Sequence, residues 1–330
     1  TIEINDDIRE LTSVVCHSLS DVPDIIDTWN EGKVVDVEGY YENAKINRVY
    51  VDRVHVKKTF AEYTAAYNAD DPKIKLKIDH TYRVAALCER IAKAAGMCAY
   101  DVELAWLSGM LHDVGRFEQI KRYNTFSDAD SVDHAKFGAD LLFKDGLIST
   151  FLNGMVKCTG YKPGALEDRY GSDGVFLYDR LNKSDMEMLE LAIRCHNMYR
   201  IPQGLNRREQ AFCNVLRDAD KVDIFKVNID TPLEEIYNTT TEELMKSDIT
   251  DEVLEAFDEE HCILKAIRRT PADTVIGHVS LAYELVYDES VRITVEQGYL
   301  GKLMHFHSDN EETNRKLSLI HISEPTRHLR

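Results

Sequence analysis

The amino-acid sequence predicts an all-α protein. Through most of the 330 residues, apolar side chains recur at steps of three and four, which places them along one face of a helix. Glycines such as Gly96 and Gly146 follow predicted helices, and Ser184-Asp-Met-Glu187 is a capping-box pattern typical of a helix start. A pattern that favours extended structure occurs only before residue 58.

Residues 1–58 are expected to form a small N-terminal segment, to which the sequence assigns no role. Within it, Asp6–Ile26 is compatible with a helix. Val49-Tyr50-Val51 and Val54-His55-Val56 are rich in β-branched residues and favour extended structure. The segment is therefore predicted to be partly extended.

From Thr59 onward the predicted elements are helices. Ile78–Ala95 places His80 on the same apolar face as Val84, because four residues span about one helical turn. In the next helix, small residues including Gly109 allow close packing, and Gly115 ends it. That helix is expected at Val102–Val114. Further helices are expected at Val132–Lys144, Ser184–His196, Arg208–Val227, Pro232–Met245, Asp251–Ile267 and Asp273–Tyr287.

Two segments are set apart from this helical domain. Gly160–Asn182 is rich in Gly, Asp and Tyr without a clean period, and is expected to be an irregular excursion or a lid. Leu317–Arg327 resembles translated sequencing-adapter read-through, so residues 317–330 are expected to be a non-native tail. The main domain is accordingly predicted over residues 59–316.

Composition narrows the function classes. The net charge is −18 and no long basic stripe interrupts it, which argues against duplex nucleic acid or an anionic membrane as partner. A small phosphorylated substrate stays compatible, because bound divalent ions reverse the local field. The seven cysteines form no Cys-x-x-Cys pair and indicate reduced thiols of a cytoplasmic protein. Glycine-rich phosphate-binding motifs are absent, which argues against a kinase or dinucleotide enzyme.

The candidate functional residues are four histidines and two aspartates on or beside predicted helices. Imidazole nitrogens and carboxylate oxygens that converge in one site are suitable ligands for divalent metals. A single one of these histidines is more simply explained by a hydrogen bond to a backbone carbonyl, so the inference depends on the set. Its members are His80, His112, Asp113, His134, His196 and Asp220.

Two positions in this set need their own argument. Asp113 is predicted at a helix C-terminus, where the helix dipole disfavours its charge unless a cation is bound nearby. Asp220 shares an apolar line with Phe212 and Leu216, whereas Asp218 and Asp223 lie off that line. We therefore prefer Asp220 as the ligand.

His80, then His112-Asp113, then Asp220 resemble, in this order, the H…HD…D signature of the HD-domain metal-dependent phosphohydrolase superfamily. His134 and His196 match the two additional histidines of its dinuclear members, such as the HD-GYP phosphodiesterases. The resemblance implies an HD-domain helical bundle with the metals between central helices. This chain has Arg116 where the family often has Lys, and it lacks the Gly-Tyr-Pro signature, so cyclic-di-GMP is not supported as substrate.

The resemblance implies a hydrolase of phosphomonoesters or phosphodiesters, with a nucleotide or other small phosphoester as substrate. The cofactors would be one or two divalent ions per chain, Mn, Fe, Mg or Co. Asp113 would be shared by the two ions, and Arg116 and Lys221 would neutralise charge on the phosphoryl group. Two alternatives stay open: a di-iron oxygenase that uses the same ligands, and a non-catalytic nucleotide-sensing module.

Overall fold

The computed structural model describes residues 51–68, 70–152, 183–232 and 239–322, and within them every regular element is a helix. The predicted all-α class is confirmed. The predicted helix Asp6–Ile26 and the excursion Gly160–Asn182 lie outside the described residues. The elements before the middle of the chain are α4 (Arg53–Thr64), α5 (Pro72–Ala94), α6 (Ala99–Leu111), α7 (Val114–Tyr123), α8 (His134–Ala139), the π-helix η1 (Asp140–Lys144) and α9 (Ile148–Leu152).

The remaining elements begin with two long helices, α11 (Lys183–Cys195) and α12 (Arg207–Asp230). Asn206 and Glu209 form a capping box that fixes where α12 starts. Beyond it lie α14 (Thr241–Lys246), α15 (Asp251–Asp258), the 3-10 helix η2 (Lys265–Ile267), α16 (Pro271–Val279), the 3-10 helix η3 (Ser280–Glu284), α17 (Asp288–Gln297), α18 (Tyr299–Met304) and α19 (Glu311–Ile322).

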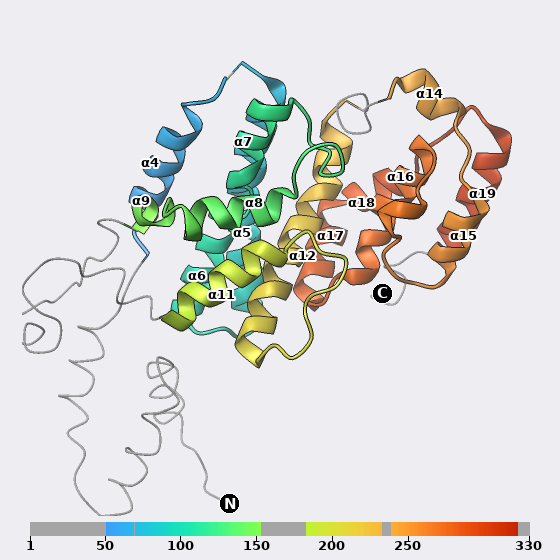
Figure 1. Ribbon diagram of the computed structural model, residues 1–330. Helices are drawn as coiled ribbons and strands as arrows, with labels where there is room; N and C mark the ends of the chain where they lie inside the picture. Colours follow the sequence, from blue (N-terminus) through green and yellow to red (C-terminus); the bar gives the residue numbers. More distant parts are fainter. Residues whose placement is uncertain (1–50, 69, 153–182, 233–238, 323–330) are drawn as a thin grey trace, which may run out of the picture.

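Helix α12 lies between the two halves of the described fold (Figure 1). Helices α4–α11 pack on one side of it around one apolar core, and most of α14–α19 pack on the other side around a second core. Helix α17 is the exception, because its Ile293 belongs to the first core. Phe212 and Leu216 of α12 belong to the first core, and Phe225, two turns further on, belongs to the second. The long helix thus carries apolar side chains into both cores, and Asp220 lies on it between them.

Helices α5 and α6 pack closely because Gly109 has no side chain. A Cβ atom at Gly109 would lie 2.6 Å from the Cα of Ala85 on α5. This close approach brings the end of α6, where His112 stands, next to His80 of α5. The close packing predicted for the small residues of this helix is present, and it helps to form the candidate site.

The expectation of extended structure at Val54-His55-Val56 is wrong, because these residues lie in α4. Asp52 caps the helix by accepting hydrogen bonds from the backbone N–H groups of Val54 and His55. Val56 is fully buried in the first core. Burial of one helical face outweighs the β-propensity of these residues, and α4 crosses the expected boundary at residue 58.

The single helix predicted at Val102–Val114 is two helices. Helix α6 ends at Leu111, and after His112 and Asp113 a new helix, α7, begins at Val114. Gly115, predicted to end a helix, lies in the first turn of α7. A Cβ atom there would lie 2.5 Å from the carbonyl oxygen of His134, so glycine is required where α7 packs on α8.

Several other helix boundaries differ from prediction. The helix expected at Val132–Lys144 starts at His134, where Asp133 provides the cap, and continues as the π-helix η1. Those expected at Asp251–Ile267 and Asp273–Tyr287 are each divided, into α15 and η2 and into α16 and η3. Of Pro232–Met245, residues 233–238 lie outside the described part. Helix α19 continues past residue 316, and Leu317 and Ile320 are buried in the second core.

Candidate metal centre

The six predicted ligand residues come together between α5, the α6–α7 junction, α8, α11 and α12. His80 lies in α5, His112 and Asp113 occupy the junction, and His134 is the first residue of α8. His196 directly follows α11, and Asp220 lies in α12. Asp220 keeps 15% of its side-chain area exposed, and the other five residues are buried.

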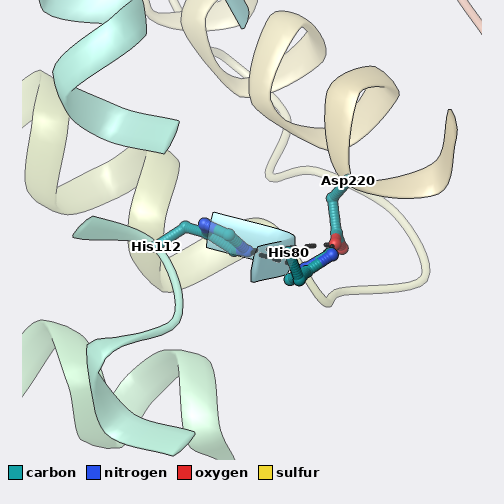
Figure 2. A group of neighbouring side chains, drawn as sticks. All are labelled: His80, His112 and Asp220. Carbon is teal, nitrogen blue, oxygen red and sulfur yellow. Dashed lines mark hydrogen bonds and ion pairs between the residues drawn. The ribbon is translucent and has the colours of Figure 1, made fainter. Parts of the chain in front are cut away.

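The first half of the site consists of His80, His112 and Asp220, whose side chains are directed toward one another (Figure 2). The His80 Nε2 atom lies 3.3 Å from the His112 Nε2 atom and 3.1 Å from the Asp220 Oδ1 atom. The His112 Nε2 atom lies 3.9 Å from the same Asp220 oxygen. These three ligand atoms are close enough to bind one ion.

The second half consists of His134 and His196. Their Nε2 atoms are 3.0 Å apart, and the two rings meet edge to face. Both imidazoles face the first half, since the rings of His112 and His196 have centroids 5.1 Å apart. The predicted convergence of these two histidines, which stand 62 positions apart in the chain, is therefore present.

Asp113 lies between the two halves. Its Oδ2 atom is 3.6 Å from the Nε2 atom of His80 and 3.5 Å from that of His112. Its Oδ1 atom is 3.5 Å from the Nε2 atom of His134 and 3.8 Å from that of His196. One carboxylate thus offers one oxygen to each half, an arrangement that suits a ligand shared by two ions.

The electrostatic argument for a cation at Asp113 needs correction. Asp113 directly follows His112, the C-cap of α6, as expected, but it is also the N-cap residue of α7, whose dipole favours its charge. Its carboxylate makes no capping hydrogen bond and is directed to the histidines instead. The Oδ1 atom is buried and has no hydrogen-bond partner among the described residues. That orphaned acceptor is the stronger indication that a cation binds here, because an unpaired buried carboxylate oxygen is costly.

Two of the histidines are held by carboxylates through their Nδ1 atoms. His80 Nδ1 lies 2.6 Å from Asp223, which also accepts two hydrogen bonds from Arg83. His134 Nδ1 lies 2.7 Å from Asp128. Each carboxylate fixes the proton on Nδ1 and leaves the Nε2 lone pair free for a ligand bond, as is typical of metal-binding histidines.

The other two histidines are held by the backbone. His112 Nδ1 donates to the carbonyl oxygen of Gly109, and His196 Nδ1 donates to that of Ile193, each at 2.7 Å. Both carbonyls belong to the helical turn that precedes the histidine. All four rings are therefore anchored at Nδ1 and present Nε2 to the centre of the site.

The charge states of His112, His134 and Asp113 suit cation binding. Burial lowers the pKa of His112 to about 4, and burial together with Arg116 lowers the pKa of His134 to about 3, so both are neutral near pH 7. Burial opposes the charge on Asp113, but Lys77 and the neighbouring imidazoles hold its pKa well below the usual range. For His80, burial is outweighed by hydrogen bonds to Asp220 and Asp223, which raise its pKa.

The two predicted cations differ in placement. The Arg116 Nε atom lies 3.7 Å from Asp113 Oδ1, beside the site as expected. Lys221 is directed elsewhere, and its ammonium donates to the carbonyl oxygen of Glu284 at 3.2 Å. The role expected of Lys221 is therefore not supported, because one residue after Asp220 corresponds to about 100° of rotation around the helix.

Sequence reasoning missed that Lys77, Asp128 and Asp223 contact residues of the site. Lys77 Nζ lies 2.7 Å from Asp113 Oδ2, in direct contact with the central carboxylate. A signal was available, because Lys77 stands three residues before His80 and such residues share a helix face. Asp128 lies in an irregular segment that carries no periodic signal, and Asp223 was considered only as a rival of Asp220.

The HD domain family model matches residues 78–322, which is most of the chain. The chain belongs to the HD domain family. HD domains bind divalent metals and are commonly found in metal-dependent hydrolases. The four converging Nε2 atoms, the shared Asp113 and its orphaned oxygen fit such ions.

A search of curated proteins and a search of solved structures each found no match to this chain. No helix in the described ranges has both the length and the apolar character needed to cross a bilayer.

Proposed function

We propose that this protein is a divalent-metal-dependent phosphohydrolase that acts on a small phosphoester, with a nucleotide among the candidate substrates. The observation that carries the proposal is Asp113, which offers one oxygen to His80 and His112 and the other to His134 and His196. This arrangement suits two ions that share a carboxylate. Asp220 completes the first half of the site.

Divalent ions held by these residues would acidify a water molecule to serve as nucleophile and would stabilise negative charge on the phosphoryl group. The side chains of this chain supply the rest. Asp223 and Asp128 accept hydrogen bonds from the Nδ1 atoms of His80 and His134, which orients both rings and directs their Nε2 atoms to the centre.

Arg116 is prepared to bind a phosphoryl oxygen. Its Nη1 atom is anchored by Gln119, the Phe126 carbonyl and Asp128, at 2.7, 2.7 and 3.0 Å. Its buried Nε atom has no hydrogen-bond partner among the described residues and lies toward Asp113. Such a fixed donor costs no reorganisation when charge develops on the substrate. Fixed cations beside the centre favour an anionic substrate.

The test is hydrolysis of a generic phosphoester by the purified chain after loading with Mn²⁺, Fe²⁺, Mg²⁺ or Co²⁺. We expect activity only with added metal, and we expect Asp113→Ala to lose both bound metal and activity. Asp79→Ala is the matched control, because Asp79 adjoins His80 in sequence but is exposed and pairs with Lys75. Unchanged activity in Asp113→Ala would refute the proposal.

The same assay separates the two alternatives. Hydrolysis that persists without oxygen and with Mn²⁺ contradicts a di-iron oxygenase. Substrate-dependent oxygen uptake by an iron-loaded protein would support one instead. Tight nucleotide binding with no turnover under any metal would indicate a sensing module.

A further inference from the structure

Two cations contact opposite oxygens of the same carboxylate. Lys77 Nζ lies 2.7 Å from Asp113 Oδ2, and Arg116 Nε lies 3.7 Å from Asp113 Oδ1. They come from different helices, α5 and α7, so their convergence is a property of the fold. Lys77 and Arg116 keep 15% and 12% of their side-chain areas exposed, and Asp113 keeps 2%. Both cations are therefore more exposed than the carboxylate that they contact.

Phe126 holds these two cations side by side. The Lys77 Nζ atom lies 5.4 Å from the centre of its ring, and the Arg116 Cζ atom lies 5.6 Å from it. Both distances are within the range of cation–π attraction. The Phe126 carbonyl also accepts a hydrogen bond from Arg116 Nη1. Phe126 thus positions an ammonium and a guanidinium next to each other at the edge of the centre.

The charges of the site indicate what these cations bind. The argument rests on the proposed function, with two divalent ions in the site. Arg83 pairs with Asp223, so three carboxylates, Asp113, Asp128 and Asp220, face the four positive charges of the two ions. One positive charge is left over, and Lys77 and Arg116 add two more. A buried group of this kind needs an anion, because uncompensated charge in a low-dielectric site is costly.

We propose that Lys77 and Arg116 form an oxyanion subsite over Phe126 that binds the phosphoryl group of a phosphomonoester. The residual charge favours a dianion, and a monoester is largely dianionic at neutral pH because its second pKa is about 6. A diester carries a single charge and would leave more of the site uncompensated. Lys77 thereby takes the role that the sequence suggested for Lys221.

A simpler role for Lys77 is that of counterion to Asp113 alone. The two roles make different predictions, since loss of a mere counterion should act mainly on metal content, whereas loss of a direct ligand should weaken anion binding at equal metal content. Lys77→Met removes the charge and keeps most of the aliphatic chain. Lys75→Met is the matched control, because Lys75 lies on the same helix, is 70% exposed and pairs with Asp79.

The first experiment titrates orthophosphate into the Mn²⁺-loaded full chain by calorimetry, with metal content measured alongside. We expect Lys77→Met to bind orthophosphate about tenfold more weakly or worse than wild type, as loss of a charge-assisted hydrogen bond implies. Lys75→Met should match wild type, and Lys77→Arg should recover most of the affinity. Equal orthophosphate affinity in wild type and Lys77→Met, at equal metal content, would overturn the subsite. Lys77→Gln replaces the methionine variant if that variant does not fold.

The second experiment compares p-nitrophenyl phosphate with bis-p-nitrophenyl phosphate. We expect wild type to prefer the monoester, and Lys77→Met to reduce kcat/KM for the monoester more than for the diester. A wild-type preference for the diester, or an equal reduction for both, would overturn the monoester assignment. If wild type hydrolyses neither compound, the proposed function fails, and the orthophosphate titration still decides whether the subsite exists.

Discussion

Asp128 is expected to control the second half of the metal centre through His134. Its carboxylate accepts hydrogen bonds from His134 Nδ1 at 2.7 Å, Arg116 Nη1 at 3.0 Å, Gln119 Nε2 at 3.0 Å and Asn197 Nδ2 at 3.3 Å. These donors come from α7, α8 and the segment after α11. Asp128→Ala would remove the shared acceptor that ties the three elements together.

The loss would fall mainly on His134. Arg116 and Gln119 keep other acceptors, and Asn197 keeps its hydrogen bond to Asp133. His134 Nδ1 has no second acceptor among the hydrogen bonds of the described residues, and the residue is 4% exposed. One orphaned buried donor together with one weakened charge-assisted bond should lower the free energy of unfolding by about 2–4 kcal/mol.

Metal binding should respond more specifically than stability. Without Asp128 the proton of His134 is free to move to Nε2, which then has no lone pair for an ion. Loss of such an outer carboxylate typically weakens metal affinity roughly 10–100-fold. Asp128→Asn should be milder, because its amide oxygen can still accept from Nδ1. Mn²⁺ titration by calorimetry, with metal content after desalting, measures the effect and should show stoichiometry that falls from about two toward one.

Asp133→Ala is the control for this prediction. Asp133 caps α8 and contacts Asn197, but it makes no bond to His134 Nδ1. Its loss should cost about 1 kcal/mol of stability and leave metal content unchanged. If Asp128→Ala binds the same amount of Mn²⁺ with the same affinity as wild type, then His134 is not a ligand that Asp128 orients.

Two further predictions concern the helices around the centre. Gly115→Ala places a Cβ atom 2.5 Å from the His134 carbonyl oxygen, so it should destabilise the fold by about 1–3 kcal/mol and lower metal content. Gly301→Ala, where nothing lies within 4 Å, should melt at or above the wild-type temperature, and equal melting of the two variants would contradict this. Burial lowers the pKa of Lys221 from 10.5 to about 8. Between these two pH values the unfolded chain binds the proton more tightly than the folded chain does. The free energy of unfolding of the wild type therefore rises as the pH rises through this range. Lys221→Met should therefore stabilise the protein at pH 7, by at most about 3 kcal/mol, and less at pH 10; an equal effect in urea unfolding at both pH values would refute this.

Much of the candidate site could be predicted because four of its six residues have a local signal, and the family resemblance pointed to the other two, His134 and His196. His80 shares a helical face with apolar neighbours, Asp220 does so in α12, and His112-Asp113 is an ordered pair between them. Helical periodicity depends on neighbours along the chain, so a sequence reports it directly. The same periodicity predicted the all-α class. It failed at the α6–α7 junction, where apolar residues continue across a break that tertiary packing imposes.

Only the tertiary structure shows which faces of different helices pack against each other. The sequence by itself determined the six ligand candidates, their order and the helical class. It did not reveal that Asp128 supports His134, because that pairing depends on an irregular segment that folds back on α7 and α8. It also pointed to Lys221 and missed Lys77, although each lies close in sequence to a predicted ligand. Lys77 contacts the centre because it stands one turn from His80 on the face that α6 and α7 cover. Lys221 does not, because one residue past Asp220 turns the side chain toward the other half of the molecule.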